Sequence, residues 1–195
     1  MTETTPLTID KSTTALVIID LQKGVVGVPT FPHASADVVA RAAKLAGAFR
    51  SHAMPVFLVH VTPSRDGKDS LRPIADAPMQ WSTSRPADWA EFVPELNPAA
   101  DDFVITKRQW GAFTGTELDL QLRRRGIGTI VLCGISTSAG VESTARFAFE
   151  FGYQQIFAED ACAARSAAEH THSTTVIFPR LGRVRTTEQV LGALS

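Results

Sequence analysis

Two charged residues of this chain stand where their side chains could do acid–base chemistry. Asp20 directly follows the aliphatic run Ala15–Ile19, and Lys107 follows the short run Val104–Thr106. Burial at the end of an apolar strand raises the pKa of a carboxyl group, whereas a nearby cation lowers it. Asp20 could therefore serve as a general acid or base, with Lys107 as its counter-ion. The alternatives are a structural ion pair and, for Asp20, a capping role.

A glycine- and hydroxyl-rich turn follows another apolar run, in the segment Cys133–Arg146. A strand that enters a tight turn before a helix points free backbone N–H groups at one place. Those groups and the helix dipole stabilise developing negative charge, as an oxyanion hole does. In nucleophile-elbow arrangements the first helical residue carries the nucleophile. Here that position falls on Ala139 and Gly140, which have no reactive side chain.

The other nucleophilic side chains near this turn are poor substitutes. Cys133 lies on a strand that we expect to be buried, and Cys162 lies in a stretch of small residues. Free cysteine is among the most buried residue types, so both thiols are expected to pack in the core. The hydroxyls of Ser136, Thr137 and Ser138 lack an evident neighbouring base.

Elements that could bring these residues together recur along the chain as apolar runs followed by amphipathic stretches. The apolar runs predict strands at Thr14–Asp20, Val56–Val61, Asp102–Thr106, Thr129–Cys133, Gln155–Ala158 and Arg183–Arg185. The amphipathic stretches predict helices near Ala34–His52, Ala87–Leu96, Thr116–Arg125, Ala139–Phe151, Ser166–Ile177 and Thr187–Leu194. Polar loops with several prolines are expected at 22–33 and 62–86.

This alternation predicts an α/β fold, a parallel sheet with helices on both faces. In such sheets the ligand sits beyond the carboxyl ends of the strands, where the strand order reverses. The residues that this rule places near a ligand are Asp20, His60 or Thr62, Lys107, the 134–140 turn and Asp160.

Length and composition restrict the class of protein. A chain of 195 residues fits one domain, residues 1–195, and the apolar (44%) and charged (20%) fractions are ordinary for globular proteins. The net charge of −1 offers no basic surplus for nucleic acid or anionic lipid. The N-terminus lacks signal-peptide features, and no apolar run approaches the roughly 20 residues of a membrane span. Two cysteines form no disulfide framework. We therefore expect a cytoplasmic protein that acts on a small molecule.

Five short segments, taken in order, resemble the isochorismatase-like superfamily, also called the cysteine hydrolase family. They are Val17–Gln22, Lys107 with the run Ala112–Leu118, Cys133–Thr137, Gly140–Arg146 and Gly182–Thr187. The resemblance covers nearly the whole chain. It implies a three-layer α/β/α fold with a six-stranded parallel sheet of Rossmann-like topology, a homodimer or homotetramer, and a cis peptide before Ser136.

The resemblance also implies the chemistry. Family members that cleave amides use an Asp–Lys–Cys triad, in which Asp20 and Lys107 match and Gly140 takes the place of the cysteine. The true isochorismatases of the family hydrolyse a vinyl ether without a covalent intermediate. In that reading Asp20 is the acid that protonates the enol-ether carbon, and Lys107 sets its charge and position. Gly140 then leaves space for a larger substrate.

The histidines do not match the metal site of the related nicotinamidases, which follows the second strand as Asp-x-His-x-His. Here the region His60–Asp66 contains one histidine, so no metal and no other cofactor are expected. His60 is expected to be a hydrogen-bonded strand-end residue. His170 and His172, two apart on a predicted helix, point to different faces and favour surface or interface roles.

Substrate contacts are expected from the turn, from the long loop and from aromatic residues. The predicted substrate-binding residues are Ser136, Thr137, Ala139, Gln80, Trp110 and Phe113. Trp81, Trp89 and Phe31 are further candidates for the pocket wall, and Trp81 and Arg85 for contacts with a carboxylated substrate.

Three functions remain open. The first is acid–base hydrolysis of an isochorismate-like vinyl ether by Asp20 and Lys107. The second is an amide or ureide hydrolase that acts without cysteine, or a cysteine enzyme into which glycine has been introduced at position 140. The third is a catalytically silent scaffold that binds a small molecule or a partner protein.

Overall fold

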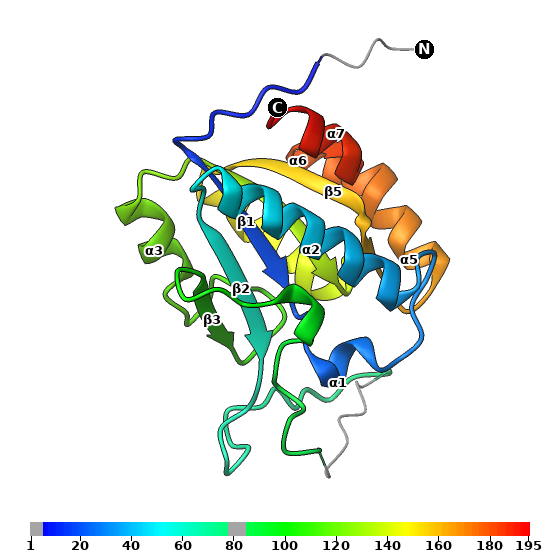
Figure 1. Cartoon of the computed structure of the whole chain (residues 1–195). Coiled ribbons are helices and arrows are strands. Elements are labelled where there is room, and N and C mark those ends of the chain that lie inside the picture. The colour runs from blue at the N-terminus through cyan, green and yellow to red at the C-terminus, as the bar shows by residue number, and fades with distance from the viewer. Residues whose placement is uncertain (1–5, 78–84) are drawn as a thin grey trace.

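The computed structural model describes residues 6–77 and 85–195, and its centre is a six-stranded parallel sheet (Figure 1). The strand order is β3-β2-β1-β4-β5-β6, and every neighbouring pair is parallel. The strands are β1 Thr14–Ile19, β2 Val56–Val61, β3 Phe103–Lys107, β4 Thr129–Ile135, β5 Gln154–Ala163 and β6 Arg183–Arg185. The fold class predicted from the sequence is therefore confirmed.

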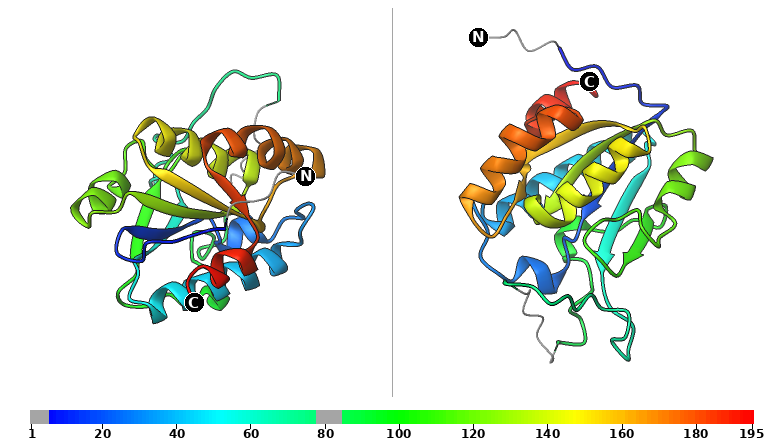
Figure 2. Two further views of the ribbon diagram at one scale, coloured as in Figure 1. Left: turned by 90° about the horizontal axis from the view of Figure 1, so that it is seen from above. Right: turned by 180° about the vertical axis from the view of Figure 1, so that it is seen from behind.

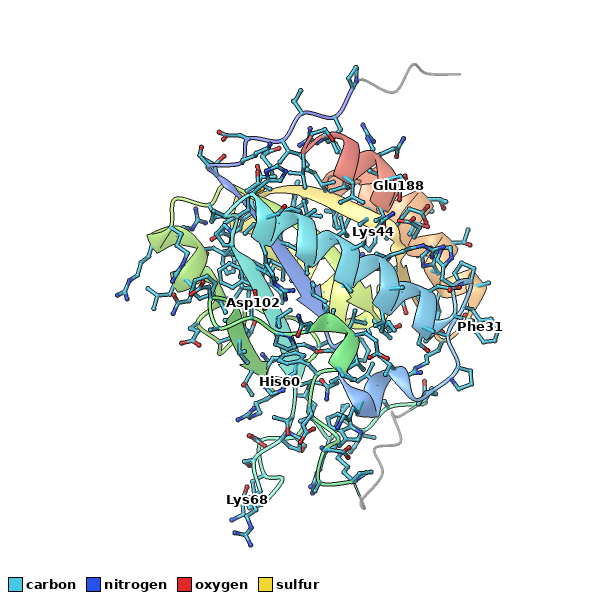
Figure 3. All side chains as sticks on the ribbon, viewed as in Figure 1. Phe31, Lys44, His60, Lys68, Asp102 and Glu188 are labelled. Atoms are coloured by element: carbon cyan, nitrogen blue, oxygen red, sulfur yellow. The ribbon has the colours of Figure 1, made fainter. Side chains whose placement is uncertain are left out.

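Helices cover both faces of the sheet (Figure 2). They are α1 Lys23–Val26, α2 Ser35–Ser51, α3 Leu118–Arg124, α4 Glu142–Glu150, α5 Ala167–His172, α6 Phe178–Leu181 and α7 Thr187–Gly192. The view from above shows α2 and α7 on one face and α3, α4, α5 and α6 on the other. An ion pair between Lys44 and Glu188 (2.7 Å) joins α2 to α7 (Figure 3). All six residues of β1 are buried, because the strand is covered by helices on both sides.

The chain reverses direction across the sheet beside β1. It runs from β1 outward through β2 to β3, and then returns to the other side of β1 with β4. The carboxyl ends of β1 and β4 therefore form the point where ligands bind in open α/β sheets. Gly134 allows the close approach of these strands, since a Cβ on it would lie 2.1 Å from the carbonyl oxygen of Ile19.

Several elements differ from the sequence prediction. β5 is longer than expected and contains Asp160, whose carboxylate accepts hydrogen bonds from the backbone N–H and the hydroxyl of Thr187 (2.6 and 2.8 Å). Asp160 therefore fastens α7 to β5 and is no strand-end ligand group. The helix expected at Ala87–Leu96 is a single 3₁₀ turn, Pro94–Leu96, because its proline interrupts the region. The loop at 22–33 contains the short helix α1.

Two π-helical turns interrupt helices that the sequence predicted as continuous. Thr137–Val141 (η2) precedes α4, and Ser173–Ile177 (η3) joins α5 to α6. Such turns are frequent at functional sites, and η2 occupies the glycine-rich turn after β4. Within the described residues we find no helix whose length and apolarity suit it to spanning a bilayer.

Candidate active site

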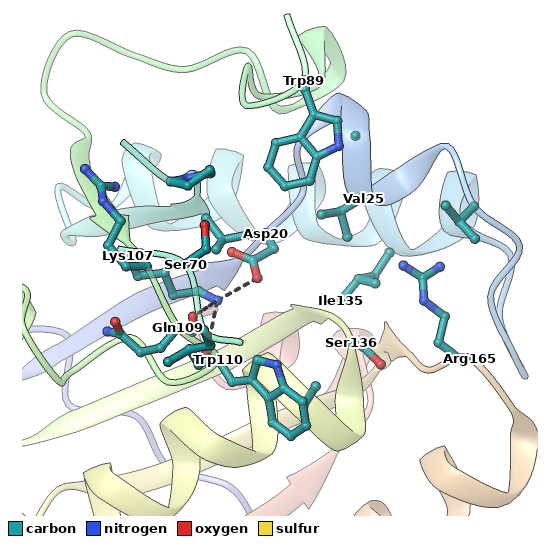
Figure 4. A pocket seen from close by; sticks show the side chains of 18 of the residues that line it. Asp20, Val25, Ser70, Trp89, Lys107, Gln109, Trp110, Ile135, Ser136 and Arg165 are labelled. Atoms are coloured by element: carbon teal, nitrogen blue, oxygen red, sulfur yellow. Dashed lines mark hydrogen bonds and ion pairs between the residues drawn. The ribbon is translucent and has the colours of Figure 1, made fainter. Parts of the chain in front are cut away.

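A cavity of about 670 Å³ opens at the carboxyl ends of the central strands (Figure 4). Asp20, at the end of β1, and Lys107, at the end of β3, lie side by side in it, and the turn after β4 forms another wall. The cavity is lined by groups from strand ends that lie far apart in the sequence. It lies where the strand-end rule predicted the site.

Asp20 and Lys107 form a buried ion pair. Lys107 Nζ lies 2.7 Å from Asp20 Oδ2. The side chain of Lys107 is 1% exposed and that of Asp20 is 8% exposed. Nζ also donates to the carbonyl oxygens of Gln109 (3.0 Å) and Trp110 (2.8 Å). The ammonium group therefore has three acceptors, which uses its full donor capacity. Because its hydrogen bonds are all made within the protein, Lys107 is fixed in place and holds one oxygen of Asp20.

The second oxygen of Asp20 is left for a ligand. Oδ1 is buried and has no hydrogen-bond partner among the described residues. Asp20 also has a left-handed backbone (φ 53°), an uncommon conformation outside glycine, and its N–H donates to the carbonyl oxygen of Val59 (2.9 Å). A buried acceptor without a partner is costly in a folded protein. The arrangement is therefore suited to a carboxyl group that acts on a bound molecule.

Burial sets the proton affinity of Asp20. Loss of solvation raises the pKa of its carboxyl group to about 6, although the charge of Lys107 and its hydrogen bond oppose the rise. A carboxyl group with this pKa exists in both protonation states near neutral pH. Asp20 can therefore give a proton or accept one, as a general acid or base must.

The turn after β4 places small groups beside this pair. The Ile135–Ser136 peptide is cis, as the family resemblance implied. The N–H groups of Ala139 and Val141 both donate to the carbonyl oxygen of Ser136 (3.2 and 3.1 Å). The hydroxyl of Ser136 is buried without a hydrogen-bond partner among the described residues. The turn is thus closed on itself and presents Ser136, Ala139 and Gly140 to the cavity.

Gly140 faces Asp20 directly. A Cβ at this position would lie 3.3 Å from Asp20 Oδ2 and 2.9 Å from Ile19 Cγ2. The first distance shows that a side chain at 140 would stand beside the ion pair. The second is shorter than real Cβ contacts, so Ile19 would have to move to admit one.

The structure brings most of the predicted site residues together but not all of them. Asp20, Lys107, Gly140, Ser136, Ala139 and Trp110 line the same cavity. Thr137 and Phe113 do not line it. The π-helical turn directs Thr137 into the interior, where its hydroxyl pairs with His170 Nδ1 (3.0 Å), and Phe113 packs against Phe151 and Tyr153. Gln80 and Trp81 lie outside the described residues.

The structure confirms the role predicted for His60 and corrects the one predicted for His170. His60 is hydrogen bonded through both ring nitrogens, to the carbonyl oxygen of Ala90 and the hydroxyl of Thr106 (2.8 Å each), as expected for a strand-end residue. His170 is 4% exposed, so the surface role expected for it is corrected. Phe31, a candidate pocket wall, is 49% exposed and does not line the cavity.

Several cavity residues were not predicted as site residues. Arg165 and Glu169 follow β5, and the prediction missed them because it ended that strand five residues too early, at Ala158. Arg108, the residue after Lys107, also lines the cavity and forms an ion pair with Asp69 (2.7 Å). Only the strand-end rule, applied to the correct strand boundaries, could have signalled them.

Gln22 has a positioning role that no motif indicated. Its buried side-chain amide donates to the carbonyl oxygens of Val61 (3.0 Å) and Trp89 (3.2 Å) and accepts from the N–H of Val61 (2.8 Å). These bonds fix the end of β2 and hold Trp89 against the cavity. Trp89 in turn packs so closely on Gly24 that no side chain fits there.

Comparisons with known proteins agree with this architecture. The family model described as "Isochorismatase domain" matches residues 14–189. "Uncharacterized isochorismatase family protein YwoC" of Bacillus subtilis (strain 168) is 55% identical over 186 residues, which cover 95% of this chain and 96% of that protein. "Uncharacterized isochorismatase family protein YecD" of Escherichia coli O157:H7 is 51% identical over 188 residues, 96% of this chain and 100% of that protein. An isochorismatase family protein from Burkholderia thailandensis has a similar structure, with a TM-score of 0.91 and 47% identity, over 96% of this chain and 97% of that chain.

Proposed function

The chain belongs to the isochorismatase family of hydrolases, and from this premise we propose that it hydrolyses a small vinyl ether of the isochorismate type by acid catalysis. The observation that carries the proposal is the raised pKa of Asp20 together with its unpartnered carboxylate oxygen. Its carboxyl group has a pKa of about 6 and a buried oxygen without a partner among the described residues, beside a position that has no nucleophile.

The first step is proton transfer from Asp20 to the terminal carbon of the enol ether. A new C–H bond forms, and the ether carbon becomes an oxocarbenium ion. Water adds to this carbon, and the resulting hemiketal loses the alcohol to leave a ketone. The proton released by water returns to Asp20, so the carboxyl group is regenerated. Lys107 holds Oδ2 throughout, which leaves Oδ1 for the substrate.

The absence of an accessible thiol supports a route without a covalent intermediate. The sequence has two cysteines, Cys133 and Cys162, and both are buried in the core. Burial raises the pKa of the Cys133 thiol to about 12 and that of Cys162 well above its ordinary value. Because the thiolate is the nucleophile, neither residue is suited to attack a substrate. Gly140, which faces Asp20, has no side chain that could act as a nucleophile.

The test is a substrate screen with purified protein and matched variants. Isochorismate and a panel of amides and ureides are incubated with the wild type, with Asp20→Asn and with Asp37→Asn, an exposed carboxylate on α2 that serves as control. We expect turnover of the vinyl ether by the wild type and the control, and its loss in Asp20→Asn. In D₂O, prompt analysis should find one deuterium on the carbon that receives the proton.

Other outcomes distinguish the alternatives. Turnover of an amide in preference to the vinyl ether, or an acyl adduct detected by mass spectrometry, would support an amide hydrolase and overturn the proposal. Full activity of Asp20→Asn would overturn the role of this residue. Tight binding of panel compounds without turnover would support a silent scaffold.

A further inference from the structure

A second group of polar side chains lies outside the proposed mechanism, on the side of the molecule where α5 meets the loop before α2. His33 comes from that loop, Glu159 from β5 and His170 from α5, and their ligand atoms all lie within 4.8 Å of one another. The side chains of His33, Glu159 and His170 are 26%, 31% and 5% exposed. Three segments, one of them far from the other two in the sequence, thus converge on one partly enclosed point.

The distances within this group fit a bound ion better than direct hydrogen bonds. Glu159 Oε2 lies 3.6 Å from His170 Nε2 and 3.9 Å from His33 Nε2. Both separations exceed the 2.7–3.2 Å range of N–H···O bonds. Two atoms bound at about 2.1 Å to a tetrahedral metal ion stand roughly 3.4 Å apart. Shifts of a few tenths of an ångström would bring Glu159 to this distance from each histidine, and the two imidazole nitrogens, which lie within 4.8 Å of each other, would close on the same ion.

The surroundings orient His170 as a ligand. Its Nδ1 lies 3.0 Å from the hydroxyl oxygen of Thr137. In the tautomer with the proton on Nδ1, this atom donates to Thr137, and the lone pair of Nε2 faces Glu159. Ligating histidines are held in this way by a partner on their second nitrogen. The two imidazole rings meet edge to face, with centroids 5.6 Å apart and planes at 87°, so their edges converge without stacking.

The charge of the group also favours a cation. Imidazoles bind a metal in the neutral form, so the ligand set would carry the one negative charge of the Glu159 carboxylate. A neighbouring cation, Arg41, is engaged by Asp160: its Nη1 donates to the carbonyl oxygen of Asp160 (2.7 Å), and its Nε lies 3.6 Å from the Asp160 carboxylate. The positive charge of Arg41 is therefore largely compensated, and the Glu159 carboxylate would offset one of the two charges of a divalent ion.

We propose that His33, Glu159 and His170 form a binding site for a divalent ion of the Zn²⁺ class. Two imidazoles and a carboxylate are ligands that Zn²⁺ prefers, and three protein ligands leave a fourth position for water. The ion ties the loop before α2 to β5 and α5, and His170 links it to the turn after β4 through Thr137. The proposal departs from the sequence-based expectation, which included no metal and gave His170 a surface or interface role.

The test uses the full chain after treatment with a chelator, titrated with Zn²⁺ alone by calorimetry and with Co²⁺ by visible absorption. We expect one ion per chain, a higher melting temperature with Zn²⁺, and a tetrahedral or five-coordinate Co²⁺ spectrum. His33→Ala and Glu159→Gln should each weaken binding by at least about tenfold, because each removes a ligand. These two side chains are partly exposed, so the variants should keep the fold, which circular dichroism without metal will check.

His172→Ala is the matched control, since His172 is exposed on the same helix and outside the group. The control should bind Zn²⁺ as the wild type does. The proposal is overturned if the wild type shows no saturable binding, if His33→Ala and Glu159→Gln bind as tightly as the wild type, or if His172→Ala loses binding to the same extent. None of these readouts depends on the substrate or on Asp20.

Discussion

Asp20 should make the protein less stable as the pH rises. Its pKa is 3.8 as an unperturbed group and about 6 in the folded protein, where burial outweighs the attraction of Lys107. The folded state therefore binds this proton more tightly than the unfolded state. The resulting stabilisation is complete below pH 4 and is lost as the pH rises through 6. A shift of about two units corresponds to about 3 kcal/mol, which is the expected size of the loss.

Urea unfolding between pH 4 and pH 7.5 measures this contribution by difference. The free energy of unfolding of the wild type minus that of Asp20→Asn should fall by about 2–3 kcal/mol across the range. Removing the Asp20 charge leaves Lys107 buried without its partner, which adds a cost with little pH dependence in this range. Asp37→Asn, an exposed control, should give a flat difference. A difference that is flat for Asp20→Asn, or that rises with pH, would refute the reasoning, because Lys107 would then outweigh burial.

Three further predictions concern activity and packing at the same site. The kcat/KM for a vinyl ether should fall above about pH 6, because the proposed mechanism uses the protonated form of Asp20. A pH–rate profile checks this, and a rate that increases with pH would exclude an acid role. Lys107→Met should move that profile to higher pH, because the ammonium group lowers the pKa of Asp20, and should reduce stability by roughly 3–5 kcal/mol at pH 7 in urea unfolding. Gly140→Cys should lower the free energy of unfolding by about 1–3 kcal/mol through contact with Ile19. Its thiol should react with iodoacetamide faster than the buried cysteines. Unchanged stability would show that the strand end yields to the new side chain.

The sequence was sufficient for the fold and for the pair at its centre. The run before Asp20 is aliphatic at every position, which identifies a strand covered on both faces, and all its residues are buried. Parallel strands bring their carboxyl ends to one edge, so Asp20 and Lys107 could be paired although 87 positions separate them. These predictions depend on periodicity and topology, which are carried by many residues at once.

The predictions that failed depend on local geometry instead. Thr137 was placed with the substrate contacts, but the π-helical turn directs it to His170. A change from α to π winding rotates each following side chain, and no composition signal announces it. Arg165 was missed because β5 continues through Glu159 and Asp160, two charged residues that are depleted in strands. The charge of Asp160 is met by Arg41, a residue distant in sequence.

Gly140 and Asp20 are structurally linked, because Ile19 at the end of β1 contacts position 140 and directly precedes Asp20. A side chain at 140 would press on Ile19, the residue immediately before Asp20. The same Cβ would lie 3.3 Å from Asp20 Oδ2, which is held at 2.7 Å by a lysine whose ammonium group is fixed by three acceptors. We therefore infer that the absence of a side chain at 140 leaves room for Ile19 and for the ion pair as they stand. In the proposed acid catalysis, Asp20 keeps one oxygen on Lys107 and offers the other to the substrate.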